Sequence, residues 1–170
     1  MTLSTSTPNP IAFIIGSGPR IGRSVAKKLT SEGYMVALGS RNPDTAQSDF
    51  VPISVDFRLC AREAPGVVVY NAAALSFPSD PSDPVGSIAP EDLERDFSVN
   101  ALGAYATLRE SVEGFRALKR DGVDAGVFVA TGNVTPFQPL PMAFTLGTGK
   151  AALVHMIQIA FQAHKDHGFR

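Results

Sequence analysis

The chain has 170 residues, 44% of them hydrophobic, which is enough to build the core of one domain. Its fifteen basic and sixteen acidic residues nearly cancel, and this balance excludes a strong general attraction to nucleic acid or membrane surfaces. The single cysteine, Cys60, excludes an internal disulfide, and neither a secretory signal nor an apolar run of about 18 residues is visible. We therefore expect a cytoplasmic protein without nucleic-acid or membrane partners.

Short apolar runs alternate with amphipathic stretches along the chain. Residues 1–10 are rich in Ser, Thr and Pro and are expected to form a flexible arm, which leaves residues 11–170 for the folded domain. Continuous apolar runs predict five buried strands, over residues 11–15, 34–38, 51–55, 66–70 and 127–130. Apolar residues at helical spacing predict a helix that ends at Gly33, one that starts at Pro90, and a last one over residues 150–164.

This alternation predicts an α/β domain with a doubly wound parallel sheet of the Rossmann type and helices on both faces. Pro52 indicates an edge position for the third strand. Residues 56–65 are barely enough for a crossover helix, so either this connection is tight or the third strand is poorly held. Two Pro-rich loops, residues 76–90 and 136–141, leave strand ends where such sheets bind ligands, and they either stiffen the chain or form walls for a substrate.

A glycine-rich turn joins the first strand to the first helix. Gly16 allows a tight turn, Gly18 removes side-chain bulk near a pyrophosphate, and Gly22 lets the helix pack closely on the strand. The helix begins near Arg20 and Ile21, where free N–H groups and a partial positive charge attract phosphates. The strand–turn–helix context favours nucleotide binding over a purely structural turn.

The end of the second strand lacks the acidic residue that binds the ribose 2′-hydroxyl in NAD sites. Ser40 and Arg41 stand there instead, and Arg41 can bind a 2′-phosphate through two charge-assisted hydrogen bonds. Arg20 can approach the same phosphate from the glycine turn. The alternative is that both arginines are ordinary solvated side chains. The pattern favours NADP(H) as the cofactor.

With these residues in view, the chain resembles the short-chain dehydrogenase/reductase family from about Ile11 to its end. The turn is similar to the family's TGxxxGxG motif, with Ile15 at the usual threonine and Arg20 at the middle glycine. The resemblance implies that Asp56 contacts the adenine amino group. It also implies that an NAG-like motif stabilises the sheet and passes close to the adenine ribose; its residues here are Asn71, Ala72 and Ala73.

The same resemblance implies a catalytic site. Asn100 matches the family asparagine whose backbone holds a water in the proton relay, and Lys150 matches the lysine that binds the nicotinamide ribose and lowers the pKa of a tyrosine. That tyrosine is expected four residues before Lys150, where Leu146 stands. The family serine, which orients the substrate carbonyl, corresponds by spacing to Asn133. These changes are similar to an atypical, largely fungal subgroup without the tyrosine.

Together these residues predict an NADP(H)-dependent oxidoreductase that transfers hydride to a small, hydrophobic metabolite. Leu146 cannot supply the proton that ketone reduction needs, and losing such help typically costs about 10² to 10⁴ in rate. An imine, an iminium ion or a conjugated acceptor, which needs no tyrosine proton, fits better. A non-redox relative that keeps NADP(H) as a cyclase-like scaffold or sensor, and an inactive relative, stay open. His164 and His167 have no third ligand in view, so no metal site is expected.

Family members continue beyond the last helix with further strands, whereas this chain stops at Arg170. In the strand order 3-2-1-4-5-6 that the resemblance implies, the sheet therefore lacks its last strands, and the fifth strand is left as a bare apolar edge. A truncated product, a minimal form closed by dimerisation and an expressed fragment all stay open. Because an exposed apolar edge invites pairing with another chain, we expect a homo-oligomer.

Overall fold

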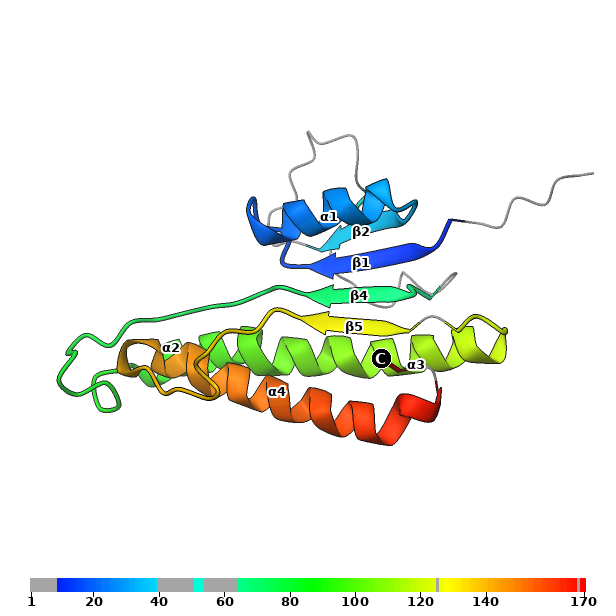
Figure 1. Ribbon diagram of the computed structural model, residues 1–170. Coiled ribbons are helices and arrows are strands. Elements are labelled where there is room, and N and C mark those ends of the chain that lie inside the picture. Colours follow the sequence, from blue (N-terminus) through cyan, green and yellow to red (C-terminus); the bar gives the residue numbers. More distant parts are fainter. Residues whose placement is uncertain (1–8, 40–50, 54–63, 125, 168) are drawn as a thin grey trace, which may run out of the picture.

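The sheet of this protein follows the predicted order. The computed structural model describes residues 9–39, 51–53, 64–124, 126–167 and 169–170. Its strands are all parallel and lie in the order β3-β2-β1-β4-β5 (Figure 1). Their bounds are β1 (Ile11–Ile15), β2 (Met35–Gly39), β3 (Val51–Ile53), β4 (Val67–Tyr70) and β5 (Val127–Ala130). The Rossmann-type α/β fold class is confirmed, and β3, with Pro52, lies at an edge as expected.

The strands read as continuous apolar runs because both faces of the sheet are buried. Phe13 and Ile15 of β1 pack in a cluster with residues of α3 (Gly103–Arg120) and α4 (Phe144–His164). Ala12 and Ile14, their neighbours along the strand, pack on the opposite face with Ala26 of α1 (Ile21–Ser31). Successive side chains of a strand point to opposite faces, so a strand covered on both sides is apolar at every position.

The helix predicted from Pro90 is a longer, compound element. It begins as α2 (Pro90–Phe97), passes through a π-helical turn, η1 (Ser98–Leu102), and continues as α3, which lies beside α4 (Figure 1). The last helix was predicted to start at Lys150, but this start is wrong. A 3₁₀ turn, η2 (Pro141–Ala143), leads directly into α4 at Phe144. Gly147 and Gly149, which are weak helix formers, lie in the missed first turns.

The fifth strand is not a fully bare edge, which corrects the sequence-based expectation. The Arg170 N–H donates to the Gly126 carbonyl at 2.8 Å, and the Phe128 N–H donates to the Arg170 carbonyl at 2.9 Å. Phe169 is buried and stacks near Phe115 and Phe128, with ring centroids 5.8 and 6.4 Å away. The last residues therefore cover the first half of β5, while the Val129 side chain is 44% exposed.

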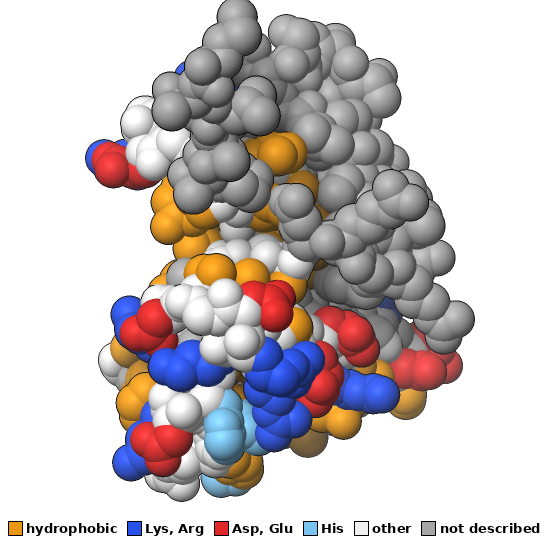
Figure 2. All heavy atoms as spheres, turned by 90° about the vertical axis from the view of Figure 1, so that its right-hand side faces the viewer, with side chains coloured by type: hydrophobic (Ala, Val, Ile, Leu, Met, Phe, Trp, Pro, Cys, Tyr) orange, Lys and Arg blue, Asp and Glu red, His pale blue; other side chains and the backbone are white. Residues whose placement is uncertain are grey.

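The end of the molecule opposite the carboxyl edge of the sheet is strongly charged. Figure 2 views this end and shows Lys, Arg, His and acidic side chains gathered over its lower part. Asp124 pairs there with Lys119 at 3.1 Å and with Arg170 at 2.6 Å. His164 approaches Arg116, with Nδ1 3.3 Å from Nη2. These groups are paired with one another and are exposed or half-buried, which is typical of a solvated surface.

Some predicted features fall outside the residues that the structure describes. These are most of the N-terminal arm, the end of the third predicted strand, and the positions Ser40, Arg41, Asp56 and Cys60. Among the helices of the described part, none is long and apolar enough to cross a membrane.

Candidate functional site

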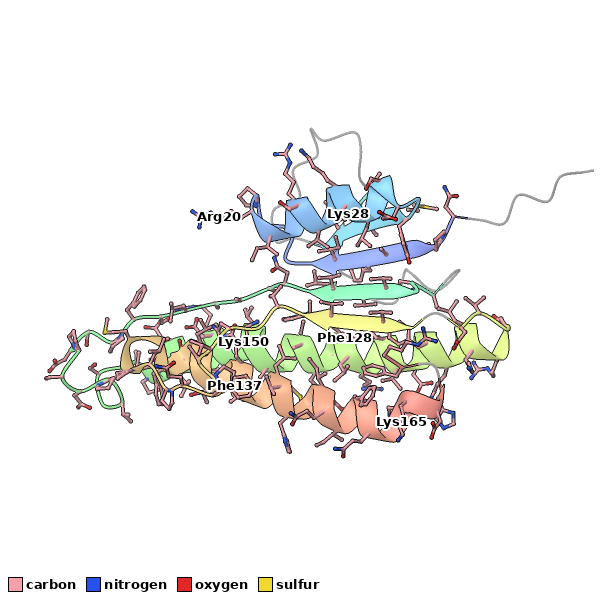
Figure 3. The ribbon with its side chains drawn as sticks, viewed as in Figure 1. Arg20, Lys28, Phe128, Phe137, Lys150 and Lys165 are labelled. Atoms are coloured by element: carbon pink, nitrogen blue, oxygen red, sulfur yellow. The ribbon has the colours of Figure 1, made fainter. Side chains whose placement is uncertain are left out.

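The carboxyl ends of the strands bring several of the predicted site residues that the structure describes to one edge of the sheet. In the parallel register Ile15 is level with both Gly39 and Tyr70, and Tyr70 is level with Ala130. The residues that follow these strands, Gly16, Asn71 and Thr131 among them, therefore lie next to one another. Such an edge, where neighbouring crossovers diverge, is where open α/β sheets bind ligands. Figure 3 shows Arg20 and Lys150 near this end of the sheet.

Two of the three glycines in the turn after β1 are required by packing. Gly16 has a φ of +85°, and a Cβ added there would lie 2.5 Å from the Ala72 backbone nitrogen. A Cβ on Gly22 would lie 2.7 Å from the Gly16 carbonyl oxygen. Gly18 differs, because a Cβ there would meet no described atom within 4 Å. Packing thus explains Gly16 and Gly22, whereas Gly18 borders space that a ligand can enter.

Asn71 locks this turn to the end of β4. Its Nδ2 donates to the Gly16 carbonyl at 2.7 Å, and its backbone N–H donates to the Ile15 carbonyl at 2.7 Å. The backbone of Ala72 presses against Gly16, and Ala73 is exposed beside it. The predicted Asn71–Ala72–Ala73 motif therefore lies in contact with the glycine turn.

Asn100 lies in the π-helical turn η1 and is completely buried. Its Oδ1 accepts a hydrogen bond from the Ala74 N–H at 2.9 Å, and its Nδ2 donates to the Ala74 carbonyl at 2.8 Å. The side chain therefore satisfies both backbone groups of one residue in the segment that leaves β4. An asparagine within a helix often bonds to the backbone of its own helix, but the Asn100 side chain bonds to Ala74 instead.

Tyr70 supports the π-helical turn, a role that sequence reasoning missed. Its hydroxyl donates to the Val99 carbonyl, and a Cβ on Gly103 would lie 2.7 Å from its oxygen. A π-helical turn disrupts the regular helical bonding pattern, so a side-chain donor is needed to satisfy such a carbonyl. Burial raises the pKa of Tyr70 to about 12. This hydroxyl consequently stays protonated and structural, and it is a poor acid.

Lys150 reaches the end of β5 from α4. Its Nζ donates to the Thr131 carbonyl at 2.9 Å, and the residue is only 3% exposed. Burial lowers the pKa of this amine, because removal from water disfavours the charged form. No carboxylate among the described residues pairs with Lys150. Its cationic form is thus poorly compensated, and it is well placed to gain from an anionic or hydroxyl-rich ligand.

The two altered positions of the predicted catalytic set, Leu146 and Asn133, lie in α4 and in the loop after β5. Leu146 is partly buried, one helical turn before Lys150 in α4. Asn133 is exposed, and its Oδ1 accepts hydrogen bonds from the Thr135 N–H at 3.1 Å and the Thr135 hydroxyl at 2.6 Å. The Asn133 amide nitrogen has no hydrogen-bond partner in the described part of the chain. It remains able to donate to a ligand.

Apolar side chains flank these polar groups. Phe137, at 74% exposed, Leu140 and Met142 project from the loop between β5 and α4, and Leu75 and Phe77 are exposed on the loop after β4. Figure 3 shows Phe137 on the side of the molecule that carries the carboxyl edge. Exposed apolar residues grouped at one end of a domain are typical of a binding surface for apolar ligands.

Close contact between Asn100 and Gly149 sets the position of α4 and gives a stability prediction. A Cβ on Gly149 would lie 2.3 Å from the Asn100 Cβ. We expect Gly149→Ala to lower the free energy of unfolding by about 1–3 kcal/mol through overpacking. This loss opposes the gain of about 1 kcal/mol that alanine usually brings to a helix. Chemical denaturation measures the difference.

Gly147→Ala is the matched control in the same helix, because the atom nearest to its added Cβ would be the Thr135 Cβ, at 3.3 Å instead of 2.3 Å. It should stay within about 1 kcal/mol of the original chain. Equal stability of the two variants would contradict the close packing of α4 on η1.

A second buried polar group, Asp96, also escaped sequence reasoning. It lies one helical turn before Asn100 and is hydrogen-bonded to Thr145 in α4. Its position four residues before Asn100 could have indicated that Asp96 is buried, since residues four apart lie on the same face of a helix. Its partner, however, lies in a different helix.

The chain was compared with known proteins. No protein-family model matches it. It is 32% identical, over 186 aligned residues, to the short-chain dehydrogenase/reductase dmxR12 of Cryptosporiopsis sp. (strain 8999). The alignment covers 95% of this chain and 74% of that protein.

Solved structures share the fold at low identity. The 3-ketoacyl-(acyl-carrier-protein) reductase from Brucella melitensis, complexed with NADH, matches with a TM-score of 0.81 at 18% identity, over 95% of this chain and 72% of that one. NADH-dependent reductase A1-R′, complexed with NAD, matches with a TM-score of 0.82 at 18% identity, over 95% of this chain and 75% of that one. ElxO with NADPH bound matches with a TM-score of 0.80 at 16% identity, over 95% and 71%.

Proposed function

The chain belongs to the short-chain dehydrogenase/reductase family, and from this we propose that it binds NADP(H) and transfers hydride to a small, apolar acceptor that needs no tyrosine proton. The observation that carries the proposal is the turn after β1. Packing requires glycine at positions 16 and 22 but not at 18, where the turn opens to a ligand. A turn of this kind before a helix N-terminus suits a pyrophosphate.

The residues that would hold the cofactor lie along the carboxyl edge. The backbone of Gly16, Gly18 and Gly22 and the helix start at Ile21 would bind the pyrophosphate. Arg20 is exposed at the start of α1, and its side chain has no partner among the described residues, so its guanidinium is free to bind a phosphate. Asn71, Ala72 and Ala73 would line the adenosine side, and Lys150 would bind the nicotinamide ribose.

The preference for NADP(H) over NAD(H) rests on Ser40 and Arg41, with Asp56 proposed at the adenine. These positions lie outside the described residues. The similar solved proteins were complexed with NADH, NAD or NADPH, so they support a nicotinamide cofactor of either kind. A bidentate arginine in place of a carboxylate favours the 2′-phosphate.

The cofactor would supply the hydride. The chain's own hydroxyls near Lys150 offer little acid catalysis: the Thr145 hydroxyl is buried and donates to Asp96, and the Thr148 hydroxyl donates to the Phe144 carbonyl. Leu146 has no proton to give. Asn133 can donate a hydrogen bond from its amide nitrogen to a substrate heteroatom. The proposed catalytic residues are therefore Asn100, Asn133 and Lys150, without a tyrosine.

This set of groups suits an imine, an iminium ion or a strongly conjugated acceptor. An iminium ion becomes a neutral amine when its carbon receives hydride, so it needs no added proton. The exposed apolar residues of the two flanking loops favour a hydrophobic substrate. On the same grounds we place the chain in the atypical subgroup that lacks the tyrosine.

Paired substrates test this function. In stopped-flow measurements of NADPH absorbance, we expect a cyclic imine to be reduced at least about 100-fold faster than the ketone of the same ring. The imine nitrogen takes its proton from water before hydride arrives and reacts as the iminium ion, whereas the ketone oxygen needs a general acid in the site. Faster turnover of the ketone would overturn the proposed chemistry. Thermal stabilisation by NADPH with no consumption of any acceptor would favour a scaffold role, and stabilisation by no nucleotide would remove the cofactor assignment itself.

A further inference from the structure

A buried carboxylate links the two helices that carry Asn100 and Lys150. Asp96 of α2 is only 1% exposed, and its Oδ2 accepts a hydrogen bond from the Thr145 hydroxyl at 2.7 Å. Burying a carboxylate costs free energy unless hydrogen bonds and a counter-charge offset the cost. The nearest described cation, Arg95, has its Nε 3.7 Å from Oδ1, and its side chain is 60% exposed. An apolar residue would be the simpler choice at this position.

Thr145 also binds the loop that follows β4. Its oxygen accepts a hydrogen bond from the Ser76 N–H at 3.2 Å, while the Ser76 carbonyl lies 3.4 Å away. A hydroxyl has one proton, and the closer, charged acceptor takes it, so Thr145 donates to Asp96 and accepts from Ser76. Arg95 also donates to the Ser76 hydroxyl at 2.7 Å. We call Asp96, Thr145 and Ser76 the buried junction.

The buried junction lies one helical turn from a second contact between the same elements. Asp96 and Asn100 are four residues apart, and so are Thr145 and Gly149. Asp96 is hydrogen-bonded to Thr145, and Asn100 is in close contact with Gly149. Two contacts spaced by one turn on both helices allow only one axial register between them.

The same two contacts hold the segment that leaves β4. Asn100 binds both backbone groups of Ala74, and Thr145 binds the N–H of Ser76, two residues further on. Lys150 lies in the turn of α4 that follows Thr145 and Gly149. A shift of α4 along its axis would therefore move the lysine away from the Thr131 carbonyl and from the edge of the sheet.

We propose that Asp96 and Thr145 are positioning residues that set the register of α4 against η1 and the 74–76 segment, and thereby place the Lys150 amine for the cofactor. This rests on the proposed function, since the amine is taken to bind NADP(H). Asp96 and Thr145 are hydrogen-bonded to each other, and we do not place either side chain in contact with the ligand. They act through Lys150.

Variants of Thr145 test the proposal through nucleotide affinity. Thr145→Val keeps the shape and removes the hydroxyl, and we expect it to weaken NADPH binding about tenfold in fluorescence titrations. Thr145→Ser, the conservative control, should bind NADPH within about twofold of the original chain, because it restores both hydrogen bonds. In a Lys150→Ala background, Thr145→Val should cause no further loss. Additive losses would overturn the proposal.

The paired variant Asp96→Leu/Thr145→Val distinguishes a positioning role of the buried junction from a role in stability alone. It removes the buried charge and its partner together and leaves only the Ser76 N–H without its acceptor, so by denaturation it should be closer in stability to the original chain than Thr145→Val alone. We expect NADPH binding to stay weak in this variant, since the hydrogen bond that sets the register is gone. Normal affinity in the stable double variant would show that the junction serves stability alone and would overturn the proposal.

Amide hydrogen exchange gives a readout without any nucleotide. The Ser76 N–H, followed by NMR, should exchange at least about tenfold faster in Thr145→Val than in Thr145→Ser, because its acceptor is lost. Unchanged exchange would overturn the junction itself. The original chain could bind no NADP(H) while the exchange of the Ser76 amide still differs between Thr145→Val and Thr145→Ser. In that case the proposed function fails, and with it the link from the buried junction to the cofactor. The hydrogen bonds of the buried junction would still be supported.

Discussion

Replacing Leu146 with tyrosine is expected to raise the rate of ketone reduction by a factor of about 100 or more. The new phenol would lie four residues before Lys150, on the same face of α4. A lysine ammonium nearby lowers the pKa of a tyrosine, which brings the proton of the phenol closer to the pH at which it can be transferred. General-acid help of this kind contributes about 10² to 10⁴ in rate. Steady-state consumption of NADPH with a cyclic ketone measures the gain.

The control for this variant is Leu146→Phe, which adds the ring without the acidic hydroxyl. It should reduce ketones no faster than the original chain, while both variants reduce the matching imine at similar rates. If Leu146→Tyr binds NADPH normally and still leaves the ketone rate unchanged, the Leu146 position does not limit the reaction. The assignment of Lys150 and Leu146 to one site would then be wrong.

The second large effect concerns the turn after β1, where Gly18→Val separates ligand binding from packing. A Cβ on Gly18 meets no described atom within 4 Å, so stability should change by no more than about 0.5 kcal/mol. The branched side chain would occupy space proposed for the pyrophosphate. A clash of about 1–3 kcal/mol weakens NADPH binding by roughly ten- to 100-fold. Isothermal titration calorimetry gives the affinity, and thermal unfolding without nucleotide gives the stability.

Gly16→Ala is the comparison, and it should behave in the opposite way. Its φ of +85° is unfavourable for alanine, and its Cβ would lie 2.5 Å from a backbone nitrogen that is held in place. Together these effects should lower the free energy of unfolding by about 2–5 kcal/mol. A Gly18→Val variant that unfolds like Gly16→Ala, or that binds NADPH as well as the original chain, would remove the main support for the cofactor site.

The strands and their order could be predicted from the sequence because both faces of the sheet are covered. Phe13 and Ile14 are neighbours in β1, yet they are buried in different clusters, so the apolar run has no polar interruption. The glycine turn could also be predicted from the sequence, since few residues other than glycine adopt the left-handed φ found at Gly16. Right-handed crossovers then restrict the strand order.

The start of α4 and the edge of β5 could not be predicted in the same way. Gly149 looks like a helix breaker in the sequence, and only its contact with Asn100 explains why glycine is needed inside the helix. At β5 the partner is Arg170, a charged residue with no strand pattern around it. In both cases the reason lies in a residue that is far away along the chain.

The sequence by itself determined the fold class, the strand order, the glycine turn and the residues to inspect, because each depends on local spacing and on the chirality of the chain. Only the tertiary structure decided which polar groups meet. The Tyr70 hydroxyl finds the Val99 carbonyl, and the buried Asp96 finds Thr145. A hydrogen bond needs two atoms within about 3 Å, and that distance is set by the register between separate elements, which no local pattern encodes.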